Sequence, residues 1–415
     1  MIITALHLPP DVLIRWTSDG SVNIGGLFEY WKWEDNAVQN IAGLDFEMYR
    51  WHLRMIDGRS NRGWMRNMMY SLTQQLVRQD PGYWLVYTLL RSDHSYRLTS
   101  YPYYTKSQQP GDPTAFRHID HNIESMAAGR GVRQIQGSLS LDDEYADDCT
   151  EIVPGMHRHL LDWCSTLHQR GLASHGYIQA VEGDTLTEED LAKYRTRWVP
   201  VPCKAGEIRV TDPRIPHGAL GPAVRPRRAI LPWYVAENED GDMEVQEAGG
   251  CEELAYAHAT FTPPPRSPSG HPNMYGKMDT PFAANVHLDG LGPISDALIG
   301  RRQWTDPEVS FLVFNLLLHP ESTAAKLEQY LQNWRQLAVT RMRQKWEAVV
   351  HMEQQAYGSK SFFTNAMDFS RQPEEDQVQD QEPADLHYLW VSGRGSPSDD
   401  GEPRDGSEYL EGEDL

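Results

Sequence analysis

Three side chains of this sequence have the types and spacing to hold one metal ion. His118 and Asp120 are one residue apart at the end of an extended stretch, FRHIDHN. Alternate residues of a strand point to the same side, so this imidazole and this carboxylate can bind the same ion. His217, far along the chain, can add a third ligand. Two histidines and one carboxylate leave three octahedral positions open, an arrangement suited to non-haem Fe(II) oxygenases, in which a 2-oxo acid and dioxygen bind.

A second His-x-Asp tripeptide shows that this spacing alone is weak evidence. His287 and Asp289 also flank one residue, but the histidines that follow them, His319 and His351, lie in segments with helical spacing. No strand with a suitable arginine follows either histidine. We therefore expect the metal site at the first tripeptide and not at the second.

Three blocks of sequence surround the candidate ligands. They are FRHIDHN at 116–122, GSLSLDDEYADDCTEIVPGMH at 137–157, and VPCKAGEIRVTDPRIPHGALGPAVRPRRAI at 201–230. In this order they resemble the phytanoyl-CoA dioxygenase-like branch of the Fe(II)/2-oxoglutarate-dependent oxygenases. The first block is similar to that family's strand-borne H-x-D. The second is similar to its acidic turn and "IPGSH" turn, with Met156 in place of the usual serine, and the third to its distal-histidine turn and closing "RPR" strand.

The resemblance implies roles for particular residues. His118, Asp120 and His217 match the three iron ligands of the family, and the cofactors would be Fe(II), 2-oxoglutarate and O2. The arginine that pairs with the far carboxylate of 2-oxoglutarate falls within the letters RPRR. Matching the family's "RPR" motif selects Arg227. Counting residues from the distal histidine to the usual position of the arginine selects Arg228 instead. We favour Arg227 and keep Arg228 as the alternative. A planar guanidinium suits this role because it binds a carboxylate bidentately and stays charged.

The strand-like segment 132–141 carries a row of hydrogen-bonding side chains. Its alternation places Gln134, Gln136 and Ser138 on one face. Asn122 closely follows the metal-binding tripeptide. We predict that these four side chains contact the substrate. The alternative, that they face solvent or brace neighbouring strands, is equally open.

Short segments rich in aromatic and β-branched residues alternate with Pro- and Gly-rich turns, a pattern typical of a barrel or sandwich. The predicted strands are 83–91, 96–105, 116–123, 132–141, 197–203, 207–211 and 227–235. The predicted helices are one or two within 45–79, one at 156–171, and a C-terminal run that begins at Asp306, is capped again at Ser322 and ends near Tyr357. The segment 252–305 is predicted to be loop-rich. We expect an α+β fold whose core is a double-stranded β-helix (jelly roll) with flanking helices.

These elements divide the chain into four parts. Residues 1–82 are predicted to be an N-terminal helical flank, 83–240 the jelly-roll core, 241–370 a loop and C-terminal helical cover, and 371–415 an acidic, disordered tail. The tail has 14 Asp and Glu against 3 Arg, so it holds −11 of the formal net charge of −21. Its composition cannot bury enough apolar surface to fold. The body lacks the basic surface that a phosphate backbone requires, so we expect no nucleic-acid partner.

The cysteines and the N-terminus indicate an intracellular protein. The cysteines form no C-x-x-C pair, which argues against a disulfide framework or a zinc site; they are Cys149, Cys164, Cys203 and Cys251. No secretory signal or membrane-spanning segment is evident, so we expect a cytoplasmic protein with no membrane partner. An apolar stripe within 327–337 is expected to pack on the barrel; the alternative is a homodimer contact through the C-terminal helices.

The resemblance implies that the chain oxidises an organic small molecule, with hydroxylation as the expected outcome and decarboxylation of 2-oxoglutarate to succinate and CO2. Desaturation and cyclisation stay open, whereas halogenation is disfavoured because Asp120 would occupy the position that a halide takes. Two alternatives belong to other classes. A catalytically inactive jelly-roll binding protein would not need all three ligands and the arginine. A divalent-metal hydrolase on a similar barrel would use three ligands and an open site, but the arginine would have no role there.

Overall fold

The computed structural model describes a defined part of the chain. The described residues are 13–16, 22–25, 41, 44–45, 47–48, 63–65, 70–91, 95–99, 103–106, 111, 115–119, 123–127, 135–172, 179–181, 183, 185–212, 214–225, 227–231, 233–236, 250–261, 286–319 and 324–366. All of them belong to the first of two units, Met1–Asp376. Several predicted features lie outside the described residues: Asp120, Asn122, Gln134, Ser322 and the acidic tail.

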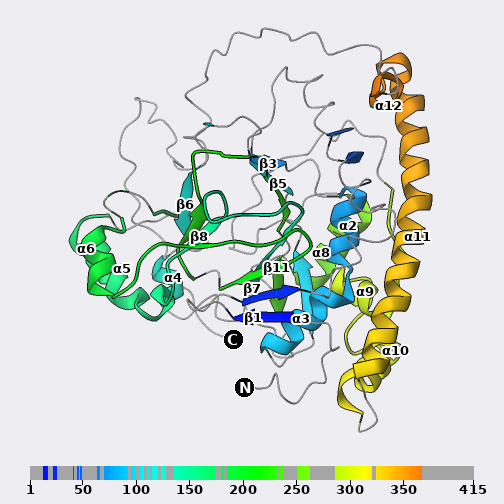
Figure 1. The fold of residues 1–415 in the computed structure, drawn as a ribbon. Helices are drawn as coiled ribbons and strands as arrows, with labels where there is room; N and C mark the ends of the chain where they lie inside the picture. The colour runs from blue at the N-terminus through cyan, green and yellow to red at the C-terminus, as the bar shows by residue number, and fades with distance from the viewer. Residues whose placement is uncertain are drawn as a thin grey trace, which may run out of the picture. The chain divides into compact units, whose positions relative to one another are not determined.

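Two antiparallel sheets form the centre of the described part (Figure 1). The larger sheet has the strand order β1 (Leu13–Trp16), β2 (Val22–Gly25), β11 (Ile208–Thr211), β7 (Ile135–Ser140), β13 (Arg227–Ile230), β5 (Tyr103–Lys106), β3 (Gly63–Met65). Two further strands of this sheet lie off that path: β14 (Trp233–Ala236) pairs with β7 and with β4 (Tyr96–Thr99). The smaller sheet has the order β10 (Val199–Val201), β8 (Thr150–Ile152), β12 (His217–Ala219), β6 (Phe116–Ile119), β9 (Gln179–Ala180). The expected mixture of helices and short antiparallel strands is confirmed.

Helices supply most of the remaining described residues. One group shares a core with the larger sheet and comprises α2 (Leu72–Arg78), α3 (Pro81–Arg91), α9 (Pro293–Leu298), α10 (Pro307–Val313), the π-helical turn η4 (Phe314–Leu318), α11 (Ala324–Tyr357) and α12 (Phe362–Ala366). The others are α4 (Ile123–Ala127), η3 (Met156–Arg158), α5 (Leu160–Gln169), α6 (Glu188–Lys193), α8 (Gly250–Thr260) and η5 (Gly358–Lys360). Within the described part of the chain, no helix combines the length and the apolar character needed to cross a bilayer.

Alternate residues of the central strand β7 face opposite ways. Leu139 is wholly buried in a core that it shares with Ile208 of β11, Ile230 of β13 and the helices α3, α9 and α11. The helices therefore cover one face of the larger sheet. Because side chains alternate along a strand, the polar Ser138 and Ser140 lie on the other face.

A second core packs α4, α5 and α6 beside the smaller sheet. It contains Ile119 of β6, Val153 after β8, Trp163 of α5 and Leu191 of α6. The burial of Ile119 in this core turns the preceding residue, His118, to the opposite face of β6.

The predicted strand at 83–91 is wrong, because Pro81–Arg91 forms the helix α3. The carbonyl of Asp80 accepts hydrogen bonds from the N–H groups of Tyr83 and Trp84 at 3.1 and 3.3 Å, which starts the helix directly after the turn. Tyr83, Trp84 and the three residues that follow are wholly buried, so the helix has no polar face here. Periodicity cannot assign a short apolar run of this kind to a helix or a strand.

Other assignments also differ from the expectation. The strand β3 lies inside the segment 45–79, for which helices were predicted, and the hairpin of β1 and β2 lies where no strand was predicted. The segment 252–305, predicted to be loop-rich, contains most of α8 and all of α9. β3 is held by long-range pairing, with Trp64 opposite Tyr104 of β5. Such long-range pairing overrides the local preference of a segment for helix or strand. The sequence by itself shows only that local preference.

The predicted start of the C-terminal helices at Asp306 is confirmed. Its side chain accepts a hydrogen bond from the N–H of Glu308 at 2.9 Å, and Pro307 is the first residue of α10. We expect Asp306→Ala to lower the free energy of unfolding by about 1 kcal/mol, because the cap is lost. Urea denaturation measures the change, and Asp306→Asn, which keeps an acceptor, should recover most of it. An alanine variant as stable as the wild type would show that the cap contributes nothing.

Candidate active site

Polar side chains line the space between the two sheets. Arg209 of β11 and Arg227 of β13 belong to the larger sheet, and both donate to the hydroxyl of Thr150 on β8 of the smaller sheet, at 2.6 and 2.9 Å. These contacts locate the three side chains between the sheets. Ser138 is directly opposite Arg209 in the register of β7 and β11, so it faces the same space. Ser140, two residues further along β7, shares that face.

Two histidines lie side by side on the inner face of the smaller sheet. In the register of β12, His217 is opposite Ile152 of β8 on one side and His118 of β6 on the other. Ile152 is two residues from Thr150, so both imidazoles face the space between the sheets. The two ring centroids are 4.3 Å apart, and both residues are buried.

The orientation of His217 suits a metal ligand. Its Nδ1 lies 2.9 Å from the carbonyl oxygen of Ile215, which can only accept, so Nδ1 carries the proton. Nε2 then keeps its lone pair for a metal ion, as is usual for histidine ligands. His118 stacks on the ring of Phe116, with centroids 4.4 Å apart, which restricts its rotation. The pair fits two of the three ligands of a site with two histidines and one carboxylate.

The third predicted ligand, Asp120, directly follows β6 and lies outside the described residues. Among the residues that are described, no three His, Cys, Asp or Glu side chains are grouped as a metal site. The second tripeptide has other contacts. His287 Nε2 lies 3.1 Å from the carbonyl oxygen of Ala259, and Asp289 Oδ1 lies 3.5 Å from Lys345 Nζ.

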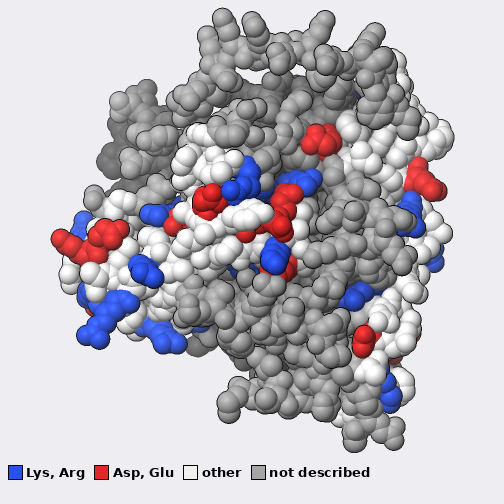
Figure 2. All heavy atoms as spheres, viewed as in Figure 1, with Lys and Arg blue, Asp and Glu red and all other residues white. Residues whose placement is uncertain are grey.

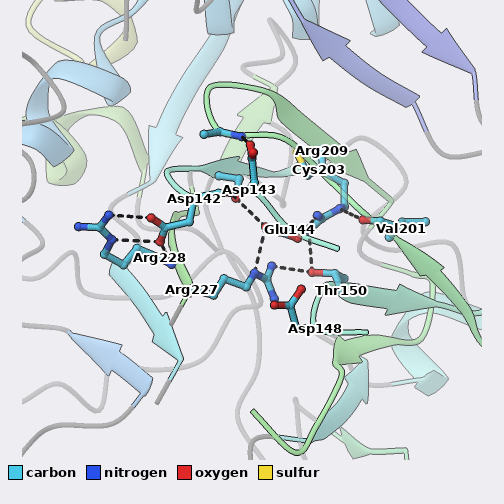
Figure 3. Close-up of polar contacts among 12 residues, drawn as sticks. Asp142, Asp143, Glu144, Asp148, Thr150, Val201, Cys203, Arg209, Arg227 and Arg228 are labelled. Atoms are coloured by element: carbon cyan, nitrogen blue, oxygen red, sulfur yellow. Dashed lines mark hydrogen bonds and ion pairs between the residues drawn. The ribbon is translucent and has the colours of Figure 1, made fainter. Parts of the chain in front are cut away.

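The two candidate arginines for the cosubstrate lie on opposite faces of β13. Arg227 is 4 % exposed; its Nε lies 3.0 Å from Glu144 Oε1, and its Nη2 donates to Thr150 (Figure 3). Arg228 instead binds Asp142 bidentately, with Nη2–Oδ1 at 2.6 Å and Nε–Oδ2 at 3.0 Å, and about a third of its side chain is exposed. Of these two, Arg227 is the one that enters the space between the sheets.

Two residues in this space, Glu144 and Arg209, were not predicted from the sequence. Arg209 donates to the Glu144 carboxylate and, through Nε, to the carbonyl oxygen of Val201 at 3.0 Å. Burial by itself would raise the pKa of Glu144, but Arg209, Arg227 and a hydrogen bond from Ser140 hold that pKa below its ordinary value. Glu144 was hidden in an acidic run that resembles a solvated turn. The sequence feature that could have revealed Arg209 is a charged residue between apolar residues within a short strand.

The inner face of β7 also carries two polar atoms that lack partners. Gln136 and Ser138 are 9 % and 8 % exposed, and neither Gln136 Oε1 nor Ser138 Oγ has a hydrogen-bond partner among the described residues. Buried polar groups are usually satisfied, so such atoms are available to a bound ligand. Asn122 and Gln134, the other two predicted substrate contacts, lie outside the described residues.

The close approach of β12 and β6 requires glycine at position 218. A Cβ on Gly218 would collide with the carbonyl oxygen of Phe116 and lie 2.8 Å from Arg117 Cα. We expect Gly218→Ala to push the strands apart, to lower the free energy of unfolding by about 1–3 kcal/mol, and to weaken metal binding, because His217 and His118 separate. Denaturation and Fe(II) titration measure the two effects. An alanine variant with wild-type stability and Fe(II) affinity would contradict this account.

Comparisons with known proteins give structural neighbours only. No protein-family model matches the chain, and no curated protein matches it. The non-haem α-ketoglutarate-dependent epimerase SnoN from nogalamycin biosynthesis is 17 % identical over 54 % of this chain and 80 % of its own, with a TM-score of 0.33. EctD from S. alaskensis with bound Fe is 17 % identical over 56 % and 83 %, with a TM-score of 0.36. AviO1 from Streptomyces viridochromogenes Tue57 is 21 % identical over 53 % and 91 %, with a TM-score of 0.34.

Proposed function

We propose that this chain is a non-haem Fe(II)/2-oxoglutarate-dependent oxygenase that hydroxylates an organic small molecule. One observation carries the proposal: His118 and His217 lie side by side on an inner face, and the buried Arg227 enters the same space from the opposite sheet. Asp120, two residues after His118, would complete the ligand set. Two antiparallel sheets joined across their inner faces support a double-stranded β-helix core of the phytanoyl-CoA dioxygenase-like kind.

Each residue would have a distinct task. Fe(II), when bound, would supply the activation of dioxygen that accompanies decarboxylation of 2-oxoglutarate to succinate. His217 would bind the metal through Nε2 while the Ile215 carbonyl keeps the ring oriented. Arg227 would bind the far carboxylate of 2-oxoglutarate, a pairing that a guanidinium favours. Gln136 and Ser138 would donate to or accept from the substrate or cosubstrate in the space between the sheets.

The polar groups on the inner face also suggest which kind of substrate could bind there. The unpartnered groups of Gln136 and Ser138 are neutral, so we propose a small, polar, organic substrate. On the face drawn in Figure 2, the described acidic and basic side chains are interspersed. We also propose that the chain has no nucleic-acid partner, because such a partner would need a basic patch. We further propose a cytoplasmic location.

Succinate release tests the proposed function. Purified protein is incubated with Fe(II), ascorbate, 2-oxoglutarate and a panel of metabolites, and succinate is measured with and without an iron chelator. We expect slow succinate formation without substrate, faster formation with the correct one, and none with the chelator. A divalent-metal hydrolase would work without 2-oxoglutarate, and an inactive binding protein would release no succinate. Protein that neither binds iron nor consumes 2-oxoglutarate would overturn the proposal.

A further inference from the structure

The short loop between β11 and β12 leads directly to the proposed metal ligand His217. Asp212, which follows β11, accepts three hydrogen bonds from Arg214: from its backbone N–H at 3.0 Å, from Nε at 2.9 Å and from Nη2 at 2.6 Å. We name this pair the Asp212–Arg214 clasp. The side chains of Asp212 and Arg214 are 24 % and 19 % exposed. Because the guanidinium binds both carboxylate oxygens, the clasp fixes the directions of the two side chains.

The hydrogen bonds of the clasp outweigh the cost of burying its carboxylate. Burial by itself would raise the pKa of Asp212, but the side-chain and backbone hydrogen bonds from Arg214 hold that pKa below its ordinary value. Hydrogen bonds to the charged form of a carboxyl group favour that form. The Asp212 carboxylate is therefore ionised at neutral pH, which is the form that accepts all three bonds of the clasp.

The backbone is held on both sides of the carbonyl group that contacts His217. On the N-terminal side, the N–H of Ile215 donates to the backbone carbonyl oxygen of Asp212 at 3.0 Å. On the C-terminal side, the carbonyl oxygen of Pro216 accepts a hydrogen bond at 2.9 Å from the N–H of Val153, which is wholly buried in the second core. The carbonyl oxygen of Ile215 lies between these two anchors, 2.9 Å from Nδ1 of His217.

We propose that Asp212 and Arg214 are positioning residues for the metal ligand His217. The clasp holds the loop so that the Ile215 carbonyl accepts the Nδ1 proton of His217, which leaves the Nε2 lone pair for the metal ion. In a neutral imidazole without such a partner the proton favours Nε2, where it would block this nitrogen as a ligand. Loss of the clasp would release the carbonyl, so the tautomer that cannot bind the metal would gain population. This inference rests on the proposed function.

The tautomer of His217 tests the inference without metal and without turnover. ¹⁵N NMR of the metal-free full chain, labelled at histidine, reports which ring nitrogen carries the proton at a pH where the ring is neutral. His217→Gln identifies the signals of His217 by their loss. We expect the Nδ1–H tautomer in the wild type and a substantial population of the Nε2–H tautomer in Asp212→Ala. Identical His217 signals in the wild type and Asp212→Ala would overturn the inference.

Metal affinity gives a second readout. Co(II), used in place of Fe(II), absorbs visible light, so titration gives both its dissociation constant and a spectrum that depends on ligand geometry. We expect the constant to rise about tenfold or more in Asp212→Ala, as is typical when an outer partner of a ligand is lost, and the visible bands to shift. Arg214→Ala keeps the backbone hydrogen bond to Asp212, so its effect should be smaller. Arg214→Lys, which can restore one side-chain bond, should recover part of the affinity.

The chain offers a matched control in the pair Arg170 and Asp190. Arg170 binds Asp190 through Nη1 and Nη2 at 2.7 and 2.8 Å, and Asp190 also accepts a hydrogen bond from the backbone N–H of Thr187 at 3.0 Å. Asp190 lies on α6, outside the sheet that carries His217. Arg170→Ala should lower the urea midpoint about as much as Arg214→Ala, but the tautomer and the Co(II) affinity should keep their wild-type values. If Arg214→Ala behaved like this control in all three measurements, the clasp would only stabilise the fold and the inference would be wrong.

Other variants keep the test decisive if Asp212→Ala does not fold, as judged by circular dichroism. Asp212→Asn keeps an acceptor oxygen but loses the charge, and Arg214→Ala keeps the backbone bond. Both should then give intermediate tautomer populations and Co(II) affinities, and wild-type values in both would overturn the inference. Wild-type protein that binds no Co(II) would overturn the proposed function, even if its His217 signals respond to these variants. Wild-type protein that binds Co(II) with an affinity that the clasp variants leave unchanged would overturn the inference alone.

Discussion

His217→Ala and Asp120→Ala should each remove turnover and weaken Fe(II) binding. Loss of one of the three proposed ligands would leave the ion with an incomplete site, and even the outer partners of metal ligands typically contribute about 10–100-fold in affinity or activity. We therefore expect succinate formation to fall by about a hundredfold or more in either variant. Succinate release and Fe(II) titration measure the two effects under the conditions of the wild-type assay.

The second His-x-Asp tripeptide provides the matched control. Asp289→Ala removes a carboxylate with the same sequence spacing, but this carboxylate lies near Lys345 and Arg301. The turnover and the iron affinity of the Asp289→Ala variant should equal those of the wild type. If Asp289→Ala abolished iron binding and Asp120→Ala did not, the metal site would have been assigned to the wrong tripeptide.

Arg227→Ala should mainly raise the concentration of 2-oxoglutarate that turnover requires. A charged hydrogen-bonded pair contributes roughly 1.5–3 kcal/mol, so the apparent KM for 2-oxoglutarate should rise by about one to two orders of magnitude. The kcat at saturating 2-oxoglutarate should change less. Glu144 keeps Arg209 as its counter-charge, so we expect the variant to fold.

Arg228→Ala distinguishes the two candidate arginines. Arg228 binds Asp142 on the face of β13 opposite to Arg227, so its removal should leave the apparent KM for 2-oxoglutarate near the wild-type value. Initial rates of succinate formation against 2-oxoglutarate concentration decide between them. The opposite result, with Arg228→Ala raising KM and Arg227→Ala not, would show that counting from the distal histidine is the better criterion.

The strands that carry His118 and Arg209 were predictable because their signals are local, whereas β12, which carries His217, was not among the predicted strands. The stretches at 116–123 and 207–211 have aromatic or β-branched residues bounded by turn residues, and both contain strands. The helix cap at Asp306 was predictable for the same reason, since an aspartate followed by proline is recognised within one turn. The run at 83–91 was not, because burial on every side removes the polar face that marks a helix.

The contacts between side chains of the candidate site could not be predicted from residues that are neighbours in the sequence. Two consecutive residues of a strand point to opposite faces, so which of Arg227 and Arg228 enters the space between the sheets depends on the phase of β13. That phase follows from the pairing of β13 with β7 and β5. The contacts of Glu144 with Arg209 and Arg227 likewise join segments far apart in sequence.

By itself, the sequence determined the residue types capable of chemistry and their order along the chain, because these are properties of the chain before it folds. It also determined some of the short strands and the helix start at Asp306, which depend on neighbouring residues. Only the tertiary structure decided that His118 and His217 are direct neighbours, because the register between β6 and β12 is set by long-range backbone pairing. The tertiary structure alone also decided which arginine is buried and which carboxylate contacts that arginine, because the ion pairs of a buried charge depend on which segments the fold brings together.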